Sequence, residues 1–434
     1  MMTVTGILMT YIIGLEVAQS LVRFVPSMET LEEKKMHLST AFWFYITSFT
    51  LFVIISFLFK DQLSELVFDA SVNVFVFEIG IISIATNAIY FFLQSVLRLN
   101  RNVKSSIILN LLYVICTSGL AIYFILFRKM GVIGNFYASI GGSLIGILIF
   151  VIINSHISFQ FNARILRKLL KFSIPLIPAS IAVYITFYVD RIFIKEFLSI
   201  ADLGVYGIAM RFASVTNILI GGFMTALGPV IYEKFADKET PQQLGKVFYL
   251  FLMSVTLLII ATALFSKELV MFITTPDYYA SFQYISILAF NIVIYNLYIF
   301  MPGLSIAKKT YYIAVIAIIS AVINLVLNYL LISIYGTWGS ILATTIASLT
   351  SQSLTFYFSN KYYKISIATR QSVLLILFSL IIALTFPMLE IWKGYFIDWY
   401  WVFIKAVILI SAAFYFFFMA KKYRLNAILK ESEN

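Results

Sequence analysis

Residues 311–334 read YYIAVIAIISAVINLVLNYLLISI, an apolar run without a charged side chain. A helix of about 20 apolar residues is long enough to cross the hydrocarbon core of a bilayer. The whole chain has this character: 62% of its 434 residues are apolar, only 12% are charged, and the mean hydropathy is +0.97. Soluble domains are roughly 45–50% apolar and about 25% charged. The sequence therefore excludes a soluble globular protein and predicts an all-α polytopic membrane protein.

Thirteen segments are apolar enough and long enough to be membrane spans. We expect them at about residues 2–20, 40–59, 73–97, 105–127, 131–153, 172–194, 203–232, 247–265, 281–304, 311–334, 338–359, 372–391 and 400–419.

The net charge of +11 and the pI of about 9.4 would point to nucleic acid in a soluble protein. Here most of the 31 lysine and arginine residues lie in alternate loops on one side, for example in 164–171 and 361–370. Few lie on the other side, where Lys60 and Lys129 are examples. Because cytoplasmic loops are enriched in lysine and arginine, this asymmetry predicts a cytoplasmic C-terminal tail. With an odd number of spans it places Met1 outside, and no nucleic-acid partner is expected.

An internal repeat organises the chain. GVIGNFYAS at 131–139 matches GTWGSILAT at 336–344, and Lys60-Asp61 matches Lys267-Glu268 in nearly the same register. Two parallel copies predict two lobes related by an axis along the membrane normal, as in a two-lobe transporter. The second copy opens with a span at 172–194 that has no counterpart in the first copy, so we expect the first copy to lack its opening helix.

The repeat predicts four regions. They are an N-terminal transmembrane lobe at 1–153, a basic cytoplasmic linker at 154–171, a C-terminal transmembrane lobe at 172–360, and an extra helix pair with a cytoplasmic tail at 361–434. We expect the linker to form an amphipathic helix on the anionic leaflet, since its positive charges alternate with apolar residues.

No hydrolytic triad, phosphate-binding loop, dinucleotide fingerprint or metal-ligand cluster is recognisable in the sequence. The loops are also too short for a membrane-embedded glycosyltransferase or polymerase. We therefore expect no enzyme activity, no cofactor and no metal. The close glycines of GGSLIG at 141–146 indicate tight helix packing through small residues, and we expect the same of Gly221 and Gly222.

Ionisable residues within the spans are the candidates for function. A charge at the centre of a membrane helix costs roughly 2.5–3.5 kcal/mol on insertion scales, so it needs a polar cavity or a partner. Arg211 lies well inside the span at 203–232, and we expect it to line a central cavity. The alternative is an intramembrane ion pair with Asp190 or Glu78.

The other candidates lie nearer to the ends of their spans. Asp190 and Arg191 either face a cavity or reach the interface, and because adjacent residues point to different helix faces we expect that they do not simply neutralise each other. Glu78 either binds a coupling proton or sodium ion, or pairs with a lysine or arginine. Seven residues separate Glu16 from Arg23, which puts both on one helix face and predicts a pair at the cytoplasmic mouth.

Two further features complete the candidates. Lys405 is close enough to the membrane interface for its long side chain to snorkel, so that the ammonium reaches water. Arginine binds a phosphate or diphosphate well, because its guanidinium donates two parallel hydrogen bonds, whereas it is a costly ligand for a neutral or cationic drug.

Several segments resemble a known family in their order and spacing. They are RFVPSMETLEEKK (23–35), YVDRIFI (188–194), DLGVYGIAMRFAS (202–214) and IYGTWGSILATTIAS (334–348). They are similar to the Wzx-type polysaccharide-biosynthesis flippases, the O-antigen and capsule translocases of the multidrug/oligosaccharidyl-lipid/polysaccharide superfamily. The resemblance implies a MATE-like bundle of two six-helix lobes plus two helices, with both termini cytoplasmic. Fourteen spans would then be expected against the thirteen counted here.

The resemblance also implies a function. The substrate would be an undecaprenyl-diphosphate-linked oligosaccharide repeat unit, moved by alternating access across the inner membrane for lipopolysaccharide O-antigen or capsule synthesis. The final two helices would shelter the lipid tail. Partners would be the lipid-linked oligosaccharide, membrane lipids, and a polysaccharide polymerase with its chain-length regulator. By this reading Arg211, Arg191 and Arg23 hold the diphosphate, and Glu78, Asp190 and Glu16 are the ion-coupling candidates. The alternative is a cation-coupled multidrug exporter of the same superfamily.

Overall fold

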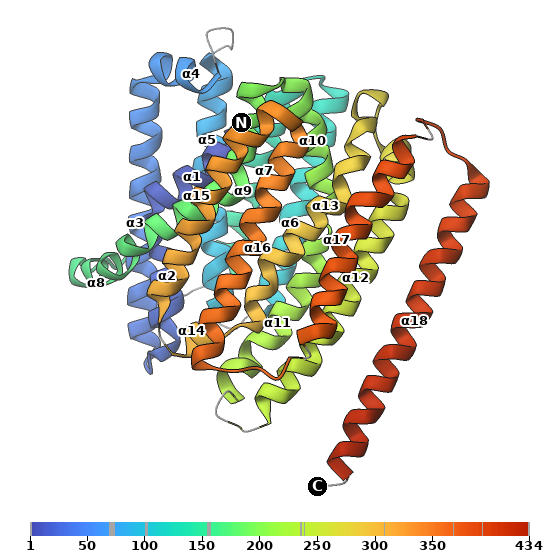
Figure 1. The fold of residues 1–434 in the computed structure, drawn as a ribbon. Helices are drawn as coiled ribbons and strands as arrows, with labels where there is room; N and C mark the ends of the chain where they lie inside the picture. Colours follow the sequence, from blue (N-terminus) through green and yellow to red (C-terminus); the bar gives the residue numbers. More distant parts are fainter. Residues whose placement is uncertain are drawn as a thin grey trace. The chain divides into compact units, whose positions relative to one another are not determined.

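The computed structural model describes residues 2–68, 74–99, 103–153, 158–234, 237, 239–307, 309–367, 369–392 and 394–432. Residues 154–157 of the predicted linker and 433–434 of the predicted tail lie outside the described residues. The described part of the chain consists of helices and short connections (Figure 1). It forms two compact units, Met1–Tyr184 and Ile185–Asn434, and the boundary between them lies within one helix, α9.

The first unit contains the helices up to the start of α9. They are α1 (Met2–Gly14), α2 (Val17–Phe24), η1 (Val25–Ser27), α3 (Leu31–Leu58), α4 (Lys60–Phe68), α5 (Val74–Leu99), α6 (Val103–Ile122), a π turn η2 (Tyr123–Phe127), α7 (Gly131–Ile153), α8 (Ala163–Ser173), η3 (Ile174–Leu176) and α9 (Ile177–Phe197).

The second unit contains the rest of α9 and the helices that follow. They are α10 (Ile200–Ala213), α11 (Thr216–Lys234), α12 (Thr240–Ile273), η4 (Pro276–Ser281), α13 (Phe282–Asn296), η5 (Leu297–Phe300), α14 (Gly303–Ile306), α15 (Thr310–Tyr335), α16 (Thr337–Tyr362), α17 (Thr369–Ile391) and α18 (Trp399–Ser432).

Ten helices in the described part of the chain are long and apolar enough to cross a membrane, or up to twelve if each of two bent pairs is one span. The bent pairs are α1 with α2 and α10 with α11. The predicted span at 338–359 is helical as α16 but does not reach the hydropathy of a span. Its sequence is rich in serine and threonine, and many of these side chains are buried against neighbouring helices. The protein is therefore all-helical and multi-pass, as the composition predicts.

The predicted span at 2–20 is broken rather than continuous. α1 and α2 meet at an angle of 59°. The two residues at the break, Leu15 and Glu16, have φ angles of 46° and 54°. Non-glycine residues rarely adopt this left-handed conformation, because their Cβ atoms then crowd the backbone. The break therefore stores strain next to a carboxylate, since Glu16 is also the N-cap residue of α2.

Small residues bring α5, α6 and α7 into close contact, as the sequence predicts. A Cβ atom on Gly141 would lie 2.7 Å from Leu120 of α6, and one on Gly146 would lie 2.6 Å from the Tyr90 ring of α5. A Cβ on Gly142 would overlap the Thr117 hydroxyl. The same expectation for Gly221 and Gly222 is wrong, because a Cβ there would meet no described atom within 4 Å.

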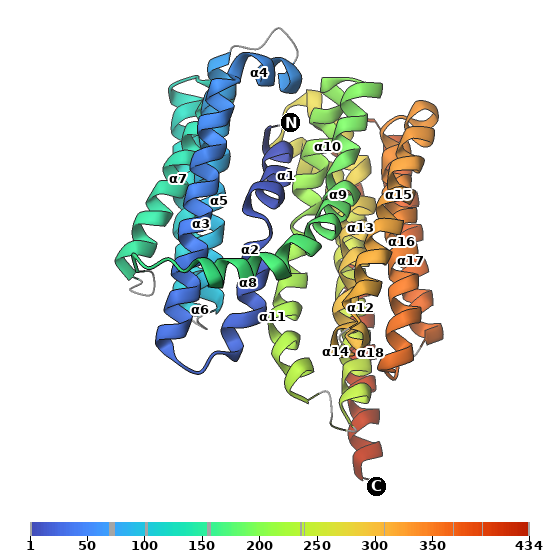
Figure 2. The same cartoon turned by 90° about the vertical axis from the view of Figure 1, so that its left-hand side faces the viewer.

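The basic linker forms a short amphipathic helix, α8, which runs across the direction of α3 and α5 (Figure 2). Leu169 is buried, and its carbonyl accepts a 2.7 Å hydrogen bond from Ser20 of α2. The four basic side chains of α8 are exposed, at Arg164, Arg167, Lys168 and Lys171.

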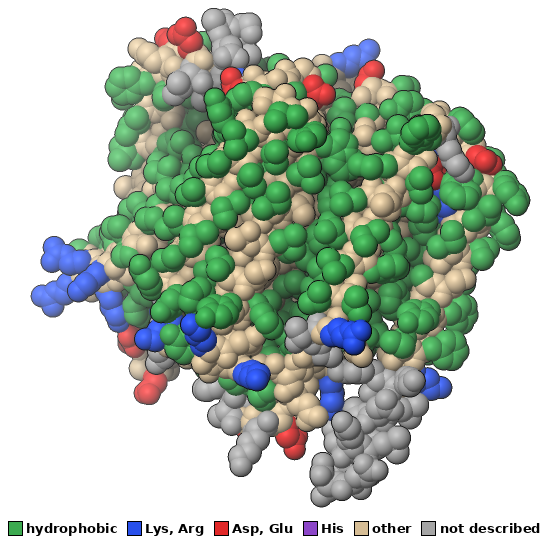
Figure 3. All heavy atoms as spheres, viewed as in Figure 1, with side chains coloured by type: hydrophobic (Ala, Val, Ile, Leu, Met, Phe, Trp, Pro, Cys, Tyr) green, Lys and Arg blue, Asp and Glu red, His purple; other side chains and the backbone are tan. Residues whose placement is uncertain are grey.

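The core of the second unit surrounds α13. Residues Phe282–Ile294 of this helix are almost all buried, and its neighbours include α10, α12, α16 and α17. A helix that is apolar on every side is stable in the core of a protein or in a lipid bilayer, and α13 lies in the core. Outward-facing positions are apolar as well: Figure 3 shows hydrophobic side chains over the middle of α15–α18 and charged ones gathered near the ends. Such a surface fits the hydrocarbon of a bilayer.

A buried cluster of four charges attaches α18 to α12 and α17. Lys405 of α18 is fully buried, and its Nζ lies 2.6 Å from Oε1 of Glu268 and 3.1 Å from Oε1 of Glu390. Lys267 lies 3.3 Å from the other oxygen of Glu390, and the Trp401 indole donates a hydrogen bond to the same carboxylate. The prediction that Lys405 reaches water is wrong, because two carboxylates from neighbouring helices bind its ammonium within the protein.

We predict that Gly142→Ala destabilises the protein by about 1–3 kcal/mol, because the new methyl group overlaps the Thr117 side chain in a tightly packed interface. The measurement is the thermal melting of the purified protein in detergent. Gly119→Ala on α6 is the matched control, since its Cβ would meet no described atom within 4 Å. The control should melt at the wild-type temperature or above it, because alanine favours a helix by about 1 kcal/mol over glycine. Equal melting of both variants would contradict tight packing at Gly142.

We predict that Lys405→Met lowers the melting temperature and exposes α18 to protease, since it leaves Glu268, whose side chain is only 16% exposed, without its cation. Removing one partner of a buried pair costs about 3–5 kcal/mol, whereas replacing both partners by apolar groups is often neutral. Lys405→Met combined with Glu268→Leu should therefore recover part of the loss. The exposed Lys421, near the other end of α18, provides the control Lys421→Met. An additive loss in the double variant would argue against the pairing.

Candidate functional site

Arg211 lies at the end of a broken helix rather than in the middle of a continuous one. It is in the last turn of α10, and the 42° bend to α11 follows at Ser214 and Val215. Its carbonyl accepts a 2.7 Å hydrogen bond from the Ser214 hydroxyl. The partial negative charge of a helix C-terminus favours a cation at this position. The Arg211 side chain is exposed and forms no ion pair with a described residue, so the predicted alternative of a pair with Asp190 or Glu78 is not formed.

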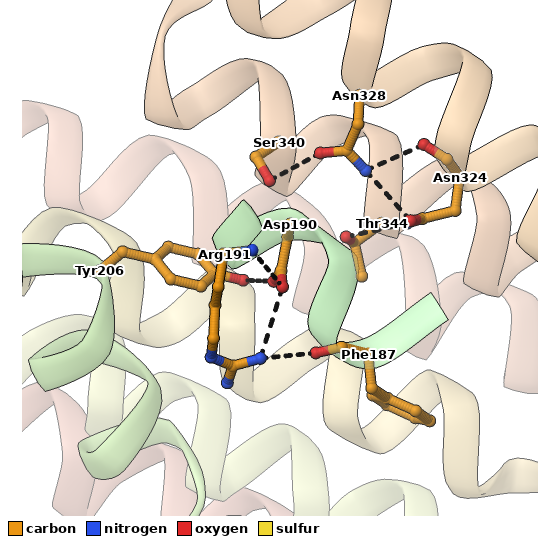
Figure 4. A network of polar contacts seen from close by, with 8 residues as sticks. All are labelled: Phe187, Asp190, Arg191, Tyr206, Asn324, Asn328, Ser340 and Thr344. Carbon is orange, nitrogen blue, oxygen red and sulfur yellow. Dashed lines mark hydrogen bonds and ion pairs between the residues drawn. The ribbon is translucent and has the colours of Figure 1, made fainter. Parts of the chain in front are cut away.

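Asp190 and Arg191 of α9 form an ion pair, so the expectation that they do not neutralise each other is wrong. Arg191 Nη1 lies 3.3 Å from Oδ1 of Asp190 and donates a 2.7 Å hydrogen bond to the Phe187 carbonyl (Figure 4). The Asp190 side chain is 3% exposed and that of Arg191 is 16% exposed. Spacing on a helix fixes where Cβ atoms point, but the long arginine side chain folds back along the helix and returns to its neighbour.

Tyr206 of α10 completes this network and was not among the residues predicted from the sequence. Its hydroxyl donates a short hydrogen bond to Oδ2 of Asp190, and both residues are buried. The Arg191 guanidinium also lies over two tyrosine rings, at 4.9 Å from the centroid of Tyr188 and 5.8 Å from that of Tyr206. The network therefore joins α9 to α10. The sequence did contain an indication of this network. The YVDRIFI and DLGVYG segments each combine a tyrosine with a charged residue.

Glu78 of α5 pairs with Lys60, the first residue of α4. Lys60 Nζ lies 2.7 Å from Oε1 of Glu78, with the lysine side chain 42% exposed and the glutamate 19% exposed. The hydrogen bond and the negative charge of Glu78 raise the pKa of the Lys60 ammonium. Of the two alternatives for Glu78, the structure contains the pairing with a lysine.

Glu16 is buried at the break between α1 and α2, where it accepts a hydrogen bond from Ser180 of α9. Arg23, in the last turn of α2, is exposed and makes no ion pair with a described residue. The predicted pair between Glu16 and Arg23 is therefore not formed. Among the described residues Glu16 has no cationic partner, which distinguishes it from Glu78 and Asp190.

A second network links α15 to α16 and was also missed from the sequence. Asn328 donates to the backbone and side-chain oxygens of Asn324 at 2.9 and 3.0 Å, and it accepts a 2.8 Å hydrogen bond from Ser340 (Figure 4). Asn324 donates to Thr344 at 3.2 Å. Polar side chains buried between membrane helices need such partners. Within the described residues no group of three or more His, Cys, Asp or Glu side chains could hold a metal ion.

The chain matches two known protein families. A profile described as "Polysaccharide biosynthesis protein" matches residues 1–235, more than half of the chain. The chain belongs to this family. It is part of the MOP superfamily, a group of transporters rather than enzymes, and the MatE profile matches residues 175–330.

Solved structures that share this fold include a flippase and a MATE transporter. The lipid II flippase MurJ has a TM-score of 0.68 and 19% identity, with 97% of this chain and 92% of that one covered. A point mutant of the Vibrio cholerae MATE transporter VcmN has a TM-score of 0.62 and 18% identity, with 83% and 85% covered. These likenesses confirm the MATE-like fold predicted from the sequence.

One curated relative of this polysaccharide biosynthesis protein matches over a short stretch. The succinoglycan biosynthesis transport protein ExoT of Rhizobium meliloti is 31% identical over 86 residues. The match spans 20% of this chain and 17% of the relative.

We predict that Asp190→Asn destabilises the protein by about 3 kcal/mol, because it leaves Arg191 largely buried without its carboxylate. Thermal melting in detergent measures the loss. Glu196→Gln is the matched control on the same helix, since the Glu196 side chain is 62% exposed and surface ion pairs contribute about 0–1 kcal/mol. If both variants melt together, the Asp190 network does not hold α9 to α10.

Proposed function

We propose that this polysaccharide biosynthesis protein is a flippase. It would translocate undecaprenyl-diphosphate-linked oligosaccharide repeat units across the inner membrane by alternating access. The products would serve O-antigen or capsule synthesis, with the C-terminal tail in the cytoplasm. A polysaccharide polymerase and its chain-length regulator would act on the translocated units.

The observation that carries this proposal is the guanidinium of Arg211, which is exposed and has no ion-pair partner among the described residues, in a chain of this family. A cation in a membrane span is costly unless it meets an anion or water. A diphosphate group is an anion that a guanidinium can bind through two parallel hydrogen bonds. Arg211 is better placed for this role than Arg191, whose guanidinium is bound to Asp190 and the Phe187 carbonyl. Arg23 is exposed as well and would add a second cation.

We assign ion coupling to Glu16 ahead of the other two carboxylates. Glu78 and Asp190 each have a cationic partner, which favours a structural role for them. Glu16 is buried at a strained helix break, and within the described part of the chain its hydrogen-bond partner is the neutral Ser180. Binding of a proton or a sodium ion at this carboxylate would alter the polar contacts at the break and so bias its geometry.

The second candidate is a cation-coupled multidrug exporter. The match of residues 175–330 to the MatE profile and the likeness to VcmN favour it. A flippase requires a cation for the diphosphate, whereas an exporter of cationic drugs does not. The Arg211 variant therefore separates the two.

We predict that a strain lacking this gene loses surface polysaccharide and that Arg211→Ala fails to restore it at normal membrane abundance. The expected loss is at least tenfold, because a charge-assisted hydrogen bond contributes about 1.5–3 kcal/mol. Arg211→Lys should restore part of the polysaccharide, as it keeps the charge but not the two-fold hydrogen bonding.

Arg370→Ala provides the matched control, since Arg370 is exposed near the start of α17. It should restore polysaccharide like the wild type. A panel of drug susceptibilities on the deletion strain tests the exporter. Normal polysaccharide with raised drug sensitivity would replace the flippase proposal by the exporter.

A further inference from the structure

The first unit contains a polar cavity that the proposed role of Arg211 does not use. It has a volume of about 460 Å³ and lies among α1, α5, α6 and α7. Ligand pockets typically measure about 300–1,000 Å³, so the space suits a small ligand. Its polar lining consists of hydroxyl and amide groups, from residues that include Thr10, Ser83, Asn87, Tyr113, Thr117 and Ser139.

The lining contains no charged side chain. A bound ion would therefore lack a compensating charge in the interior of a membrane protein, which is costly. The cavity also offers aromatic surface from Phe91, Tyr113 and Phe136. A ligand that matches both features is neutral, carries several hydroxyl groups and has an apolar face. A sugar ring has these properties.

Part of the wall is fixed in place by hydrogen bonds. The Tyr113 hydroxyl donates to Oδ1 of Asn87 at 2.9 Å, and Nδ2 of Asn87 donates to the Ser139 hydroxyl. The Tyr113 ring stacks on Tyr90, with centroids 4.1 Å apart and an interplanar angle of 14°. Side chains locked by packing and hydrogen bonds provide the pre-organisation that a specific site needs.

One hydroxyl in the wall remains available for a ligand. The Thr117 Oγ1 atom is buried and lies near the Tyr113 hydroxyl, but its geometry makes no hydrogen bond with a described residue. Leaving a buried polar group unsatisfied costs about 1–3 kcal/mol. A ligand that hydrogen-bonds Thr117 would remove this cost.

The corresponding helix pair of the internal repeat, α15 and α16, has different polar contacts at this position. When 131–139 is aligned with 336–344, Ser139 corresponds to Thr344. Extending the alignment without a gap pairs Asn324 with Gly119, so the first copy lacks an asparagine at that position. In the second copy Asn324 and Thr344 bond to each other within the buried network between α15 and α16. The hydrogen bond between asparagine and threonine that occupies this position in the second copy therefore has no counterpart in the first copy, which has Gly119 there.

We propose that this cavity binds one neutral sugar residue of the transported glycan and so contributes to substrate selectivity. The inference rests on the proposed flippase function. It assigns the glycan a recognition site in the first unit that is separate from the cations that would hold the diphosphate.

The test measures sugar binding directly on the full-length protein in nanodiscs, by saturation-transfer NMR. The ligands are glucose, galactose, rhamnose and N-acetylglucosamine, and inorganic phosphate is added as a competitor. At least one neutral sugar should bind, and phosphate should not displace it. Thr117→Val removes the unpaired hydroxyl while keeping the side-chain shape, so the fold should be preserved. We expect it to weaken sugar binding about fivefold, the equivalent of one hydrogen bond.

Asn87→Leu removes the central amide and should weaken binding further. The matched control is Thr216→Val on α11, because Thr216 Oγ1 is also buried without a described hydrogen-bond partner but does not line the cavity. It should bind sugar like the wild type, and melting temperatures confirm that all variants are folded. No sugar binding, or binding that Thr117→Val and Asn87→Leu leave unchanged, would overturn the inference.

The experiments distinguish failure of this inference from failure of the flippase proposal. If gene deletion abolishes surface polysaccharide but the cavity variants bind sugar normally, the inference alone fails. If deletion leaves surface polysaccharide intact, the flippase proposal fails, and sugar binding lost in Thr117→Val would still identify a sugar site in the first unit.

Discussion

The structure depends on one constraint: inside a bilayer every polar group must find its partner within the protein. A chain with 62% apolar residues has few polar side chains to place, and each placement has a visible consequence. Lys405 meets two carboxylates, and Asn328 meets Asn324 and Ser340. These partners join helices that apolar packing alone would leave free to slide, since lipid tails compete equally for apolar contacts.

The same constraint makes the exceptions informative. Arg211 is exposed at a helix break. Among the described residues, the buried Glu16 has no cationic partner and the Thr117 hydroxyl has no hydrogen-bond partner. Two of these lie at or beside the bends between α1 and α2 and between α10 and α11. A break frees backbone groups from the helix and gives polar side chains a more hydrophilic neighbourhood, which is why irregular backbone in membrane proteins accompanies cavities and sites.

Composition and the length of the apolar runs were enough to predict an all-helical membrane protein, because a run of about 20 apolar residues has few alternatives to a membrane helix. The MATE-like arrangement was predicted from the resemblance to a family. Composition and run length could not predict which partners the long charged side chains reach in the folded protein. Asp190 and Arg191 are adjacent, yet they pair because the arginine chain is long. Lys405 does not reach water, because Glu268 and Glu390, far away in the sequence, lie beside it. Gly142 and Gly221 look alike in sequence, and only their neighbours distinguish a packed glycine from an open one.

The two lysine pairs at helix ends differ in their access to ions. The Lys60–Glu78 pair is partly exposed, with the lysine side chain 42% accessible. Dissolved salt screens such a pair, since the Debye length is about 8 Å at physiological ionic strength. Lys405 is fully buried and the Glu268 side chain is only 16% exposed, so salt screens this cluster less than it screens the Lys60–Glu78 pair. A rise in salt would therefore weaken the contact between α4 and α5 more than the attachment of α18, which gives the two units different responses to their surroundings.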